Sequence, residues 1–240
     1  MGNLKLAVCP HDTVRNSEGW YRLVQYLSNS MSLEVSFGLA LDFADFHERF
    51  AASDLVYANA GDTLKLVDQH GYSAIARVTG RFDEAVVVAS TELADAAVAK
   101  MGGAKLATIN GTLPMKLAMR MLQAQGMNPG EIVGRDSWLG VVQAVWGGDA
   151  PYGVLDRDSY ADLSPQGQAM VTLLHTTNEQ CAFHSFCVAP SLAGQAEQLR
   201  QALVAMTSDN LGKEVLNDLN MPGWEAVDAA NLATIRELMA

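Results

Sequence analysis

Asp54-Leu55-Val56-Tyr57-Ala58-Asn59-Ala60-Gly61-Asp62-Thr63 is the stretch that decides the fold, because a strand pattern passes directly into a helix pattern within it. Its first half is a short apolar run typical of a buried strand, and Asp62–Gln69 continues with helical spacing. The same order occurs at the N-terminus, where strand-like Leu4–Val8 precedes Ser17–Leu27, whose apolar residues recur at helical spacing. Strands that alternate with helices predict an α/β fold rather than a sandwich or a helical bundle.

A second series of strands and helices follows the first. Ala85–Ala89 is a continuous apolar run, Glu92–Met101 is predicted to be helical, and strand-like Lys105–Ile109 leads through a loop into the helix Leu113–Gln125. From Ser191 onward the pattern is helical, so we expect no strand in this tail.

Two extended segments could carry the chain between two lobes, one near Val86–Ser90 and one near Phe183–Ala189. This hypothesis divides the chain into a discontinuous first lobe, residues 1–88 and 188–240, and an inserted second lobe, residues 89–187. A single doubly wound sheet fits the periodicity almost as well.

The composition is that of a folded protein with a strong negative charge. Hydrophobic residues make up 49% of the 240 residues and charged ones 18%, which leaves ample apolar surface for a core. The formal net charge of −11 repels phosphate polymers and anionic lipids, so we expect no binding to nucleic acid or membrane surfaces. No apolar run reaches the roughly 18 residues that span a bilayer, so we expect no direct membrane insertion.

The N-terminus opens on a strand pattern rather than a secretion leader. Met1–Val8 lacks a positively charged start, an apolar centre and a cleavage site. The predicted location is therefore cytoplasmic if the chain is complete as written, and periplasmic if a leader has been removed.

Common catalytic and metal-binding signatures are missing from the sequence. It contains no phosphate-binding P-loop, no dinucleotide-binding glycine motif, no nucleophile elbow and no zinc-protease motif. The five histidines are scattered without ligand spacing, and the three cysteines lie in apolar segments typical of packed thiols. We therefore expect no catalytic residue, no metal and no cofactor.

Three polar loops follow predicted strands and open predicted helices: Cys9–Ser17, Asn59–Thr63 and Thr108–Thr112. Backbone amides at the start of a helix lack partners and carry partial positive charge. Ligands of open α/β sheets bind at the carboxyl ends of strands, so we expect these loops at a ligand-binding edge.

The loop before Leu113 is the strongest candidate for an anion site. The amides of Asn110, Gly111 and Thr112, together with the hydroxyl groups of Thr108 and Thr112, could cradle an anion. Gly111 would let the backbone approach a ligand closely. The alternative is ordinary capping of the next helix by Thr112.

Four further residues are candidates with structural alternatives. Tyr57 could donate its phenol to a ligand oxygen or could cover the core. His11 and Asp12 could close a cleft or form a solvated turn. Asp156 could contact a ligand or cap the segment at Ser159–Leu163.

Five segments carry a resemblance to a known family, and they are spread over most of the chain: Leu6–Asp12, Asp54–Asp62, Leu106–Leu117, Gly148–Val154 and Leu216–Trp224. They resemble the phosphate, phosphite and phosphonate substrate-binding proteins of ABC importers.

The resemblance implies a type II periplasmic-binding-protein fold, with two α/β lobes, two hinge strands and an oxyanion in the cleft between them. Tyr57 stands where the family has a cleft tyrosine, Thr108–Thr112 where it has a Ser/Thr-rich helix start, and Asp156 near a polar contact of the second lobe. Ile109 and Asn110 interrupt the hydroxyl run here, which reduces the number of side-chain donors.

The leading hypothesis is a non-catalytic binding protein for a phosphonate-like or related oxyanion, acting as the solute receptor of an ABC importer or as a sensory relative. Its partners would be the small oxyanion and either an ABC permease or a sensory protein. The alternative is an enzyme for a small metabolite on the same two-lobe fold, with His11, Asp12 or Asp156 as acid–base groups.

Overall fold

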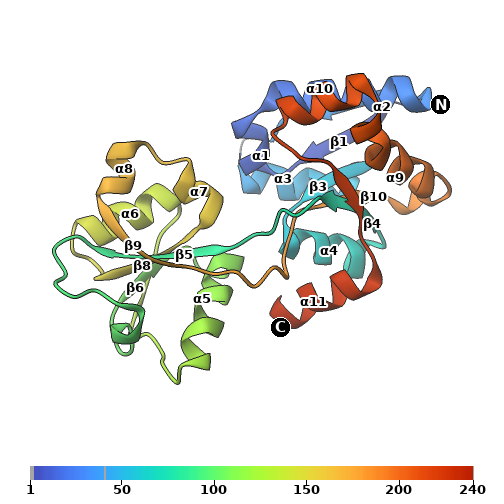
Figure 1. Cartoon of the computed structure of the whole chain (residues 1–240). Helices are drawn as coiled ribbons and strands as arrows, with labels where there is room; N and C mark the ends of the chain where they lie inside the picture. The colour runs from blue at the N-terminus through green and yellow to red at the C-terminus, as the bar shows by residue number, and fades with distance from the viewer. Residues whose placement is uncertain (1–2, 41, 240) are drawn as a thin grey trace. The chain divides into compact units, whose positions relative to one another are not determined.

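The computed structural model describes residues 3–40 and 42–239. The chain forms two compact units, drawn in Figure 1. Unit 1 comprises Met1–Phe82 and Phe183–Glu237, and unit 2 comprises Asp83–Ala182 with the terminal Leu238–Ala240. The sequence placed these boundaries after residues 88 and 187. Two strands begin just after the boundaries, at Ala85 and at Ser185, and each lies wholly within one sheet. The chain therefore changes unit before each of these strands begins.

Unit 1 contains a mixed sheet with the strand order β11-β4-β10-β3-β1-β2. The strands are β1 (Leu4–Val8), β2 (Val35–Gly38), β3 (Leu55–Ala58), β4 (Ser73–Val78), β10 (Ser185–Val188) and β11 (Trp224–Ala226). Strand β1 runs parallel to β2 and β3, whereas β10 runs antiparallel to β3 and β4. The prediction of a tail without strands is wrong, because β11 pairs antiparallel with β4. A three-residue strand is too short to show a period of two.

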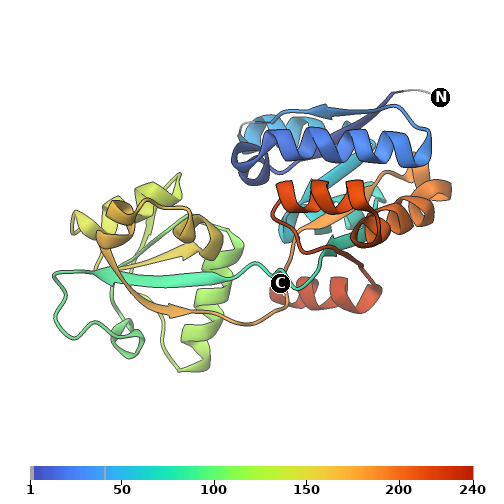
Figure 2. The ribbon, with the colours of Figure 1, turned by 45° about the horizontal axis from the view of Figure 1, so that its top comes forward.

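Helices cover both faces of this sheet, as Figures 1 and 2 show. They are α1 (Pro10–Arg15), α2 (Ser17–Met31), α3 (Phe43–Arg49), α4 (Ala60–His70), α9 (Ala196–Ala205), α10 (Asn210–Asp218) and α11 (Ala229–Met239), with short 3-10 turns at Phe50–Ala52, Pro190–Gln195 and Met206–Ser208. Leu6 and Val8 point into the core beneath α2, α9 and α10, while Ala7 points into the core beneath α3 and α4. This alternation along β1 places one hydrophobic core on each face.

Unit 2 contains a second mixed sheet with the order β7-β6-β8-β5-β9. Its strands are β5 (Ala85–Ser90), β6 (Leu106–Thr108), β7 (Ile132–Gly134), β8 (Tyr152–Asp156) and β9 (Val171–Thr176), and its helices are α5 (Leu113–Ala124), α6 (Trp138–Trp146), α7 (Arg157–Ala161) and α8 (Pro165–Ala169). Strand β6 runs parallel to β7 and β8, so their carboxyl ends lie at one edge. Both sheets confirm the predicted α/β class.

The helix predicted over Glu92–Met101 is wrong. The structure has turns there, followed by a single 3-10 turn at Val98–Lys100. Asp95 takes a left-handed backbone conformation with φ of 54°, which cannot continue a right-handed helix.

The Arg77 side chain packs against two aromatic rings at the edge of unit 1. The guanidinium of Arg77 lies 4.7 Å from the ring centroid of Phe82 and 4.6 Å from that of Phe183. Its Nη2 is 2.7 Å from Oε1 of Glu225. Phe82 and Phe183 are the residues next to the two boundaries of unit 1, so this stack fixes the unit 1 side of both connections.

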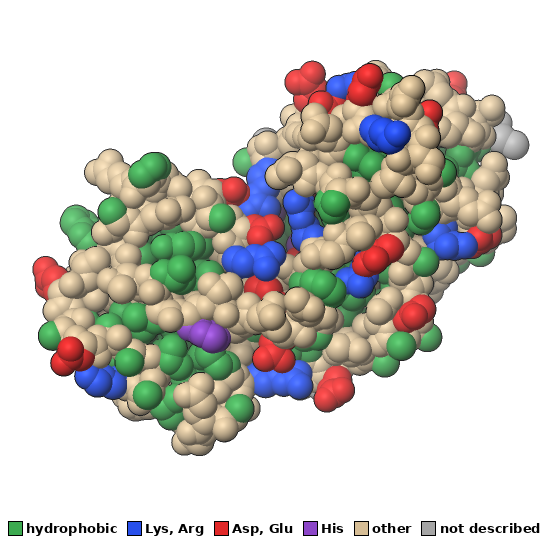
Figure 3. All heavy atoms as spheres, viewed as in Figure 1, with side chains coloured by type: hydrophobic (Ala, Val, Ile, Leu, Met, Phe, Trp, Pro, Cys, Tyr) green, Lys and Arg blue, Asp and Glu red, His purple; other side chains and the backbone are tan. Residues whose placement is uncertain are grey.

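The surface carries mixed charges. On the face of unit 1 seen in Figure 3, acidic and basic side chains are interspersed rather than gathered into one patch. Among the described residues, no helix is both long enough and apolar enough to cross a bilayer.

Candidate functional site

The loop between β6 and α5 has the geometry of a helix-start anion site. Gly111 takes a left-handed conformation with φ of 72°, and the helix begins at Leu113 after Thr112. The Thr112 hydroxyl donates to the Ile109 carbonyl at 2.8 Å and does not cap a helix amide, so the predicted side-chain cap is wrong. The hydroxyl stabilises the turn instead, and the start of the helix is left for another acceptor.

This loop contains three main-chain amides without a backbone acceptor. Within residues 3–40 and 42–239, the amides of Asn110, Gly111 and Thr112 donate to no backbone carbonyl. A Cβ atom added to Gly111 would meet no heavy atom within 4 Å, so the space in front of this turn is open. Thr108 is fully buried, and its hydroxyl has no hydrogen-bond partner in the described part of the chain. An oxyanion could accept hydrogen bonds from the three amides and gain from the dipole of α5.

Asn110 belongs to this turn by position, but its side chain packs toward β7. Its Nδ2 atom lies 2.6 Å from the place that a Cβ on Gly134 would occupy. Gly134 pairs with Thr108 in the parallel register of β6 and β7. The absence of a side chain at Gly134 therefore makes room for the Asn110 amide group.

Asp156 is a helix cap. It ends β8, at the same sheet edge as the end of β6, and its Oδ1 accepts a hydrogen bond from the Ser159 amide at 2.7 Å. The structure thus shows the capping role that the sequence analysis gave as the alternative for Asp156, and the capped helix is α7. Burial raises the pKa of Asp156, and the nearby Asp83 adds to this rise, while the bond from Ser159 opposes it.

We expect Asp156→Asn to stabilise the protein at neutral pH, because asparagine keeps the capping oxygen without the charge. The pKa of Asp156 is higher in the folded state than in the unfolded state, so the protonated carboxyl stabilises the fold. This contribution is present below the unfolded-state pKa and is lost as the pH rises through the folded-state pKa. The advantage of the variant in free energy of unfolding should therefore shrink as the pH falls from 7 toward about 4.

Urea denaturation of both proteins across this pH range measures the difference. Asp156→Ala is the control, because it also removes the cap and should cost about 1 kcal/mol relative to Asp156→Asn. A variant with the same stability as the wild type at every pH would contradict the assignment.

On unit 1, the segment after β1 is a helix rather than the predicted polar loop. Pro10 occupies the first turn of α1, where its missing N–H costs nothing. The ring of His11 packs edge-on against Phe43, with centroids 5.0 Å apart. The carboxylate of Asp12 turns to His184, whose Nε2 lies 3.5 Å from Oδ2. His11 and Asp12, adjacent in sequence, thus have different neighbours.

Tyr57 is a core residue by its burial. Its side chain is 1% exposed, its ring lies 4.8 Å from that of Trp20, and it stacks on His184 at 5.5 Å with an angle of 29°. The structure therefore brings Asp12 and Tyr57 together through His184. The predicted convergence of Tyr57 with Thr108–Thr112 involves both units and stays a prediction, as do the ligand roles of His11, Asp12, Tyr57 and Asp156.

Sequence reasoning did not find Cys9 and His184, which lie beside Asp12. The Cys9 amide donates to the Tyr57 carbonyl at 2.8 Å, and His184 immediately precedes β10. Burial raises the pKa of the Cys9 thiol, and the neighbouring His184 lowers it by less. Only the pairing of β10 with β3 brings these residues together, and no spacing in the sequence signals that pairing.

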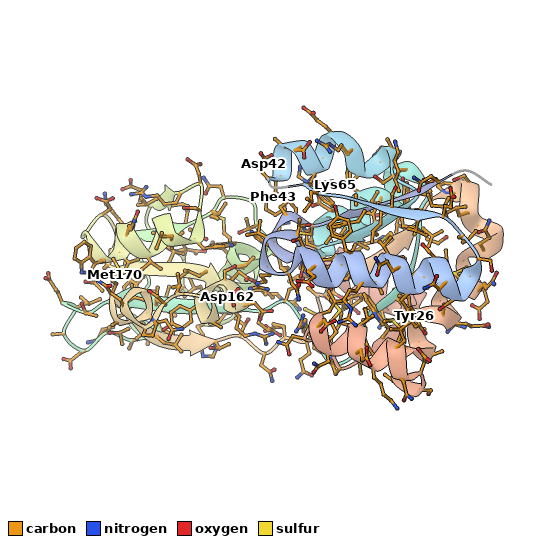
Figure 4. All side chains as sticks on the ribbon, turned by 90° about the horizontal axis from the view of Figure 1, so that it is seen from above. Tyr26, Asp42, Phe43, Lys65, Asp162 and Met170 are labelled. Atoms are coloured by element: carbon orange, nitrogen blue, oxygen red, sulfur yellow. The ribbon has the colours of Figure 1, made fainter. Side chains whose placement is uncertain are left out.

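The third predicted loop, Asn59–Thr63, forms the start of α4 and carries a buried carboxylate. Asp62 accepts hydrogen bonds from Lys65 Nζ at 2.8 Å and Asn59 Nδ2 at 2.8 Å, and its oxygens lie 3.0 Å from His47 Nε2. Figure 4 shows Lys65 near the start of α3, where Asp42 and Phe43 lie. Burial alone would raise the pKa of Asp62, but hydrogen bonds from Lys65 and His47 outweigh it and lower the pKa. This carboxylate stabilises the loop and does not offer a site to an anion.

Comparison with solved structures shows the same fold. XAC2383 from Xanthomonas citri bound to ATP is 18% identical, with a TM-score of 0.76 over 100% of this chain and 96% of that one. PhnD1 from Prochlorococcus marinus in complex with methylphosphonate is 16% identical, with a TM-score of 0.76 over 98% and 96%. SsuA from Escherichia coli, an aliphatic sulphonate binding protein, is 12% identical, with a TM-score of 0.68 over 99% and 85%. No curated protein matches the chain.

These likenesses confirm the type II periplasmic-binding-protein fold. The family model described as "ABC transporter, phosphonate, periplasmic substrate-binding protein" matches residues 6–232. Proteins of this family bind substrates and are not enzymes, so the prediction of a non-catalytic solute receptor is confirmed and the enzyme alternative is not supported. With nearly its whole length matched, the chain belongs to the family of phosphonate substrate-binding proteins of ABC transporters.

Proposed function

We propose that this receptor binds a phosphonate-like oxyanion at the turn before α5, and that it delivers this ligand to an ABC permease. The observation that carries the proposal is a turn whose amides, those of Asn110, Gly111 and Thr112, donate to no backbone carbonyl in the described residues, with open space at Gly111, directly before a 12-residue helix. The buried Thr108 hydroxyl is a further donor at this turn.

Known ligands of similar proteins support an anion. PhnD1 holds methylphosphonate, XAC2383 holds ATP in one structure and chloride in another, and SsuA is named for aliphatic sulphonates. All of these ligands are anionic. A chain with a net charge of −11 can hold an anion only through short-range donors, because its overall field is repulsive. Main-chain amides at a helix start supply such donors.

The ligand class is tested by isothermal titration calorimetry with phosphate, phosphite, methylphosphonate and sulfate. Binding of at least one of them with a measurable heat is the expected result. No binding across this panel would contradict the proposal, because the panel contains a phosphonate and the small tetrahedral oxyanions related to it.

We expect Gly111→Leu to weaken oxyanion binding at least tenfold, because its side chain would fill the space in front of the amides. Gly103→Leu is a matched control in the same unit, since Gly103 also has φ of 72° and open space around its Cβ position. Both variants force leucine into a left-handed conformation, so both should lose about 1–2 kcal/mol of stability. Equal affinities in the two variants would show that the ligand does not bind at this turn.

A further inference from the structure

A thiol, an imidazole and a carboxylate from three segments meet at the carboxyl edge of the unit 1 sheet. Cys9 follows β1, Asp12 lies in α1, and His184 precedes β10. One potential ligand atom from each residue lies within 4.8 Å of the other two. We propose that Cys9, Asp12 and His184 form a binding site for one divalent transition-metal ion, best fitted by Zn²⁺.

The spacing of the nitrogen and oxygen atoms fits a shared ion. His184 Nε2 and Asp12 Oδ2 are 3.5 Å apart, which is longer than the usual charge-assisted hydrogen bond of about 2.7–2.9 Å. Two such ligands bound to one tetrahedral Zn²⁺ at about 2.0–2.1 Å stand about 3.3 Å apart. The two atoms therefore need to move by only a few tenths of an ångström to bind the same ion.

The chemistry of the three groups also suits zinc. Sulfur, nitrogen and carboxylate oxygen are its ordinary protein ligands, whereas Mg²⁺ and Ca²⁺ prefer oxygen alone. On binding, the Cys9 thiol loses its proton to solvent and the sulfur bonds to the ion. Thiolate and carboxylate together carry two negative charges, which a dication neutralises in this largely buried place.

The three ligand residues lie just below the surface. Cys9 is fully buried, while the side chains of Asp12 and His184 are 14% and 20% exposed. The two ligand atoms themselves, Asp12 Oδ2 and His184 Nε2, are buried, so these side chains would have to shift slightly to admit an ion. Three protein ligands leave the fourth tetrahedral position for a water molecule.

Backbone hydrogen bonds and an aromatic contact position the three residues. The amides of Asp12 and Thr13 both donate to the Cys9 carbonyl at 3.0 Å, so the start of α1 is tied to the thiol-bearing residue. The indole of Trp20 donates to the Asp12 carbonyl at 3.2 Å, and the Tyr57 ring stacks on His184. Such outer contacts orient metal ligands and raise metal affinity.

Titration of the reduced, chelator-treated full chain with Zn²⁺ alone tests the proposal. We expect one ion per chain at micromolar protein concentration, and a thiolate-to-metal absorption band when Co²⁺ is added instead. Cys9→Ser should abolish that band, and Asp12→Asn and His184→Gln should each weaken Zn²⁺ binding at least tenfold. Asp12→Asn changes a partly exposed side chain, so it remains informative if a Cys9 variant does not fold.

The matched controls are Cys181→Ser and His175→Gln, which change a partly exposed thiol and an exposed imidazole in unit 2. Both should bind Zn²⁺ as the wild type does. The proposal is overturned if the wild type binds no Zn²⁺ at micromolar concentration, or if the controls lose the ion while the Asp12 and His184 variants keep it. No oxyanion is present in this titration, so its outcome is independent of the phosphonate assignment.

Discussion

Replacing Tyr57 by alanine is expected to lower the free energy of unfolding by about 3–5 kcal/mol, the usual cost of removing a large buried aromatic ring. The ring is 1% exposed and packs against Trp20, His184 and Trp224, with centroids 4.8, 5.5 and 5.8 Å away. Two of these rings are held in regular elements, Trp20 in α2 and Trp224 in β11, so collapse into the space left by Tyr57 should be limited. Chemical denaturation followed by circular dichroism measures the loss.

The control is Tyr21→Ala on α2, since the Tyr21 side chain is 47% exposed and should cost far less. Equal losses in the two variants would contradict the core role of Tyr57.

Tyr57→Phe separates packing from ligand binding. This variant keeps the ring, so stability should fall by no more than about 1 kcal/mol. If the phenol binds the oxyanion, as the family resemblance implies, affinity for the oxyanion should fall by about tenfold, the effect of one lost hydrogen bond. Unchanged affinity in calorimetry would leave Tyr57 with its packing role alone.

The sequence predicts those parts of the fold that have a regular hydrophobic period. Strands β1, β3 and β5 are apolar runs, and helix α5 has apolar residues at helical spacing, so each was predicted at nearly its observed bounds. Short elements escape this reasoning. Helix α1 has only six residues and reads as a polar loop, and β11 exists because Trp224 is buried against the sheet.

The candidate site residues also fall into those that the sequence could identify and those that it could not. The turn Thr108–Thr112 was recognisable because a glycine and a helix start are adjacent in sequence, and the cap role of Asp156 follows from its place at a strand end. The cluster of Cys9, Asp12 and His184 was not recognisable. It depends on the antiparallel insertion of β10 between β3 and β4, which joins residues from opposite ends of the chain.

A buried carboxylate joins the outgoing and returning segments within unit 2. Glu84 is 1% exposed, and it accepts hydrogen bonds from the Thr177 hydroxyl and from the Gln180 amide at 2.8 Å. The Thr177 hydroxyl in turn accepts from the Ala85 amide at 2.9 Å. The Asp83 amide donates to the Ala182 carbonyl at 2.8 Å. These bonds fix the start of β5 against the segment that follows β9, directly beside both unit boundaries.

Glu84→Ala is therefore expected to destabilise unit 2 by about 3 kcal/mol, because the Thr177 hydroxyl and the Gln180 amide each lose an acceptor at about 1–3 kcal/mol. Glu84→Gln keeps the volume and one acceptor oxygen, so its loss should be smaller. Glu179→Ala, an exposed acid in the same segment, is the control and should change stability by less than about 0.5 kcal/mol. Hydrogen exchange of the β5 and β9 amides localises the effect to unit 2. Protection that falls equally in unit 1, or a Glu84→Ala loss no larger than that of the control, would show that this carboxylate does not hold the two segments together.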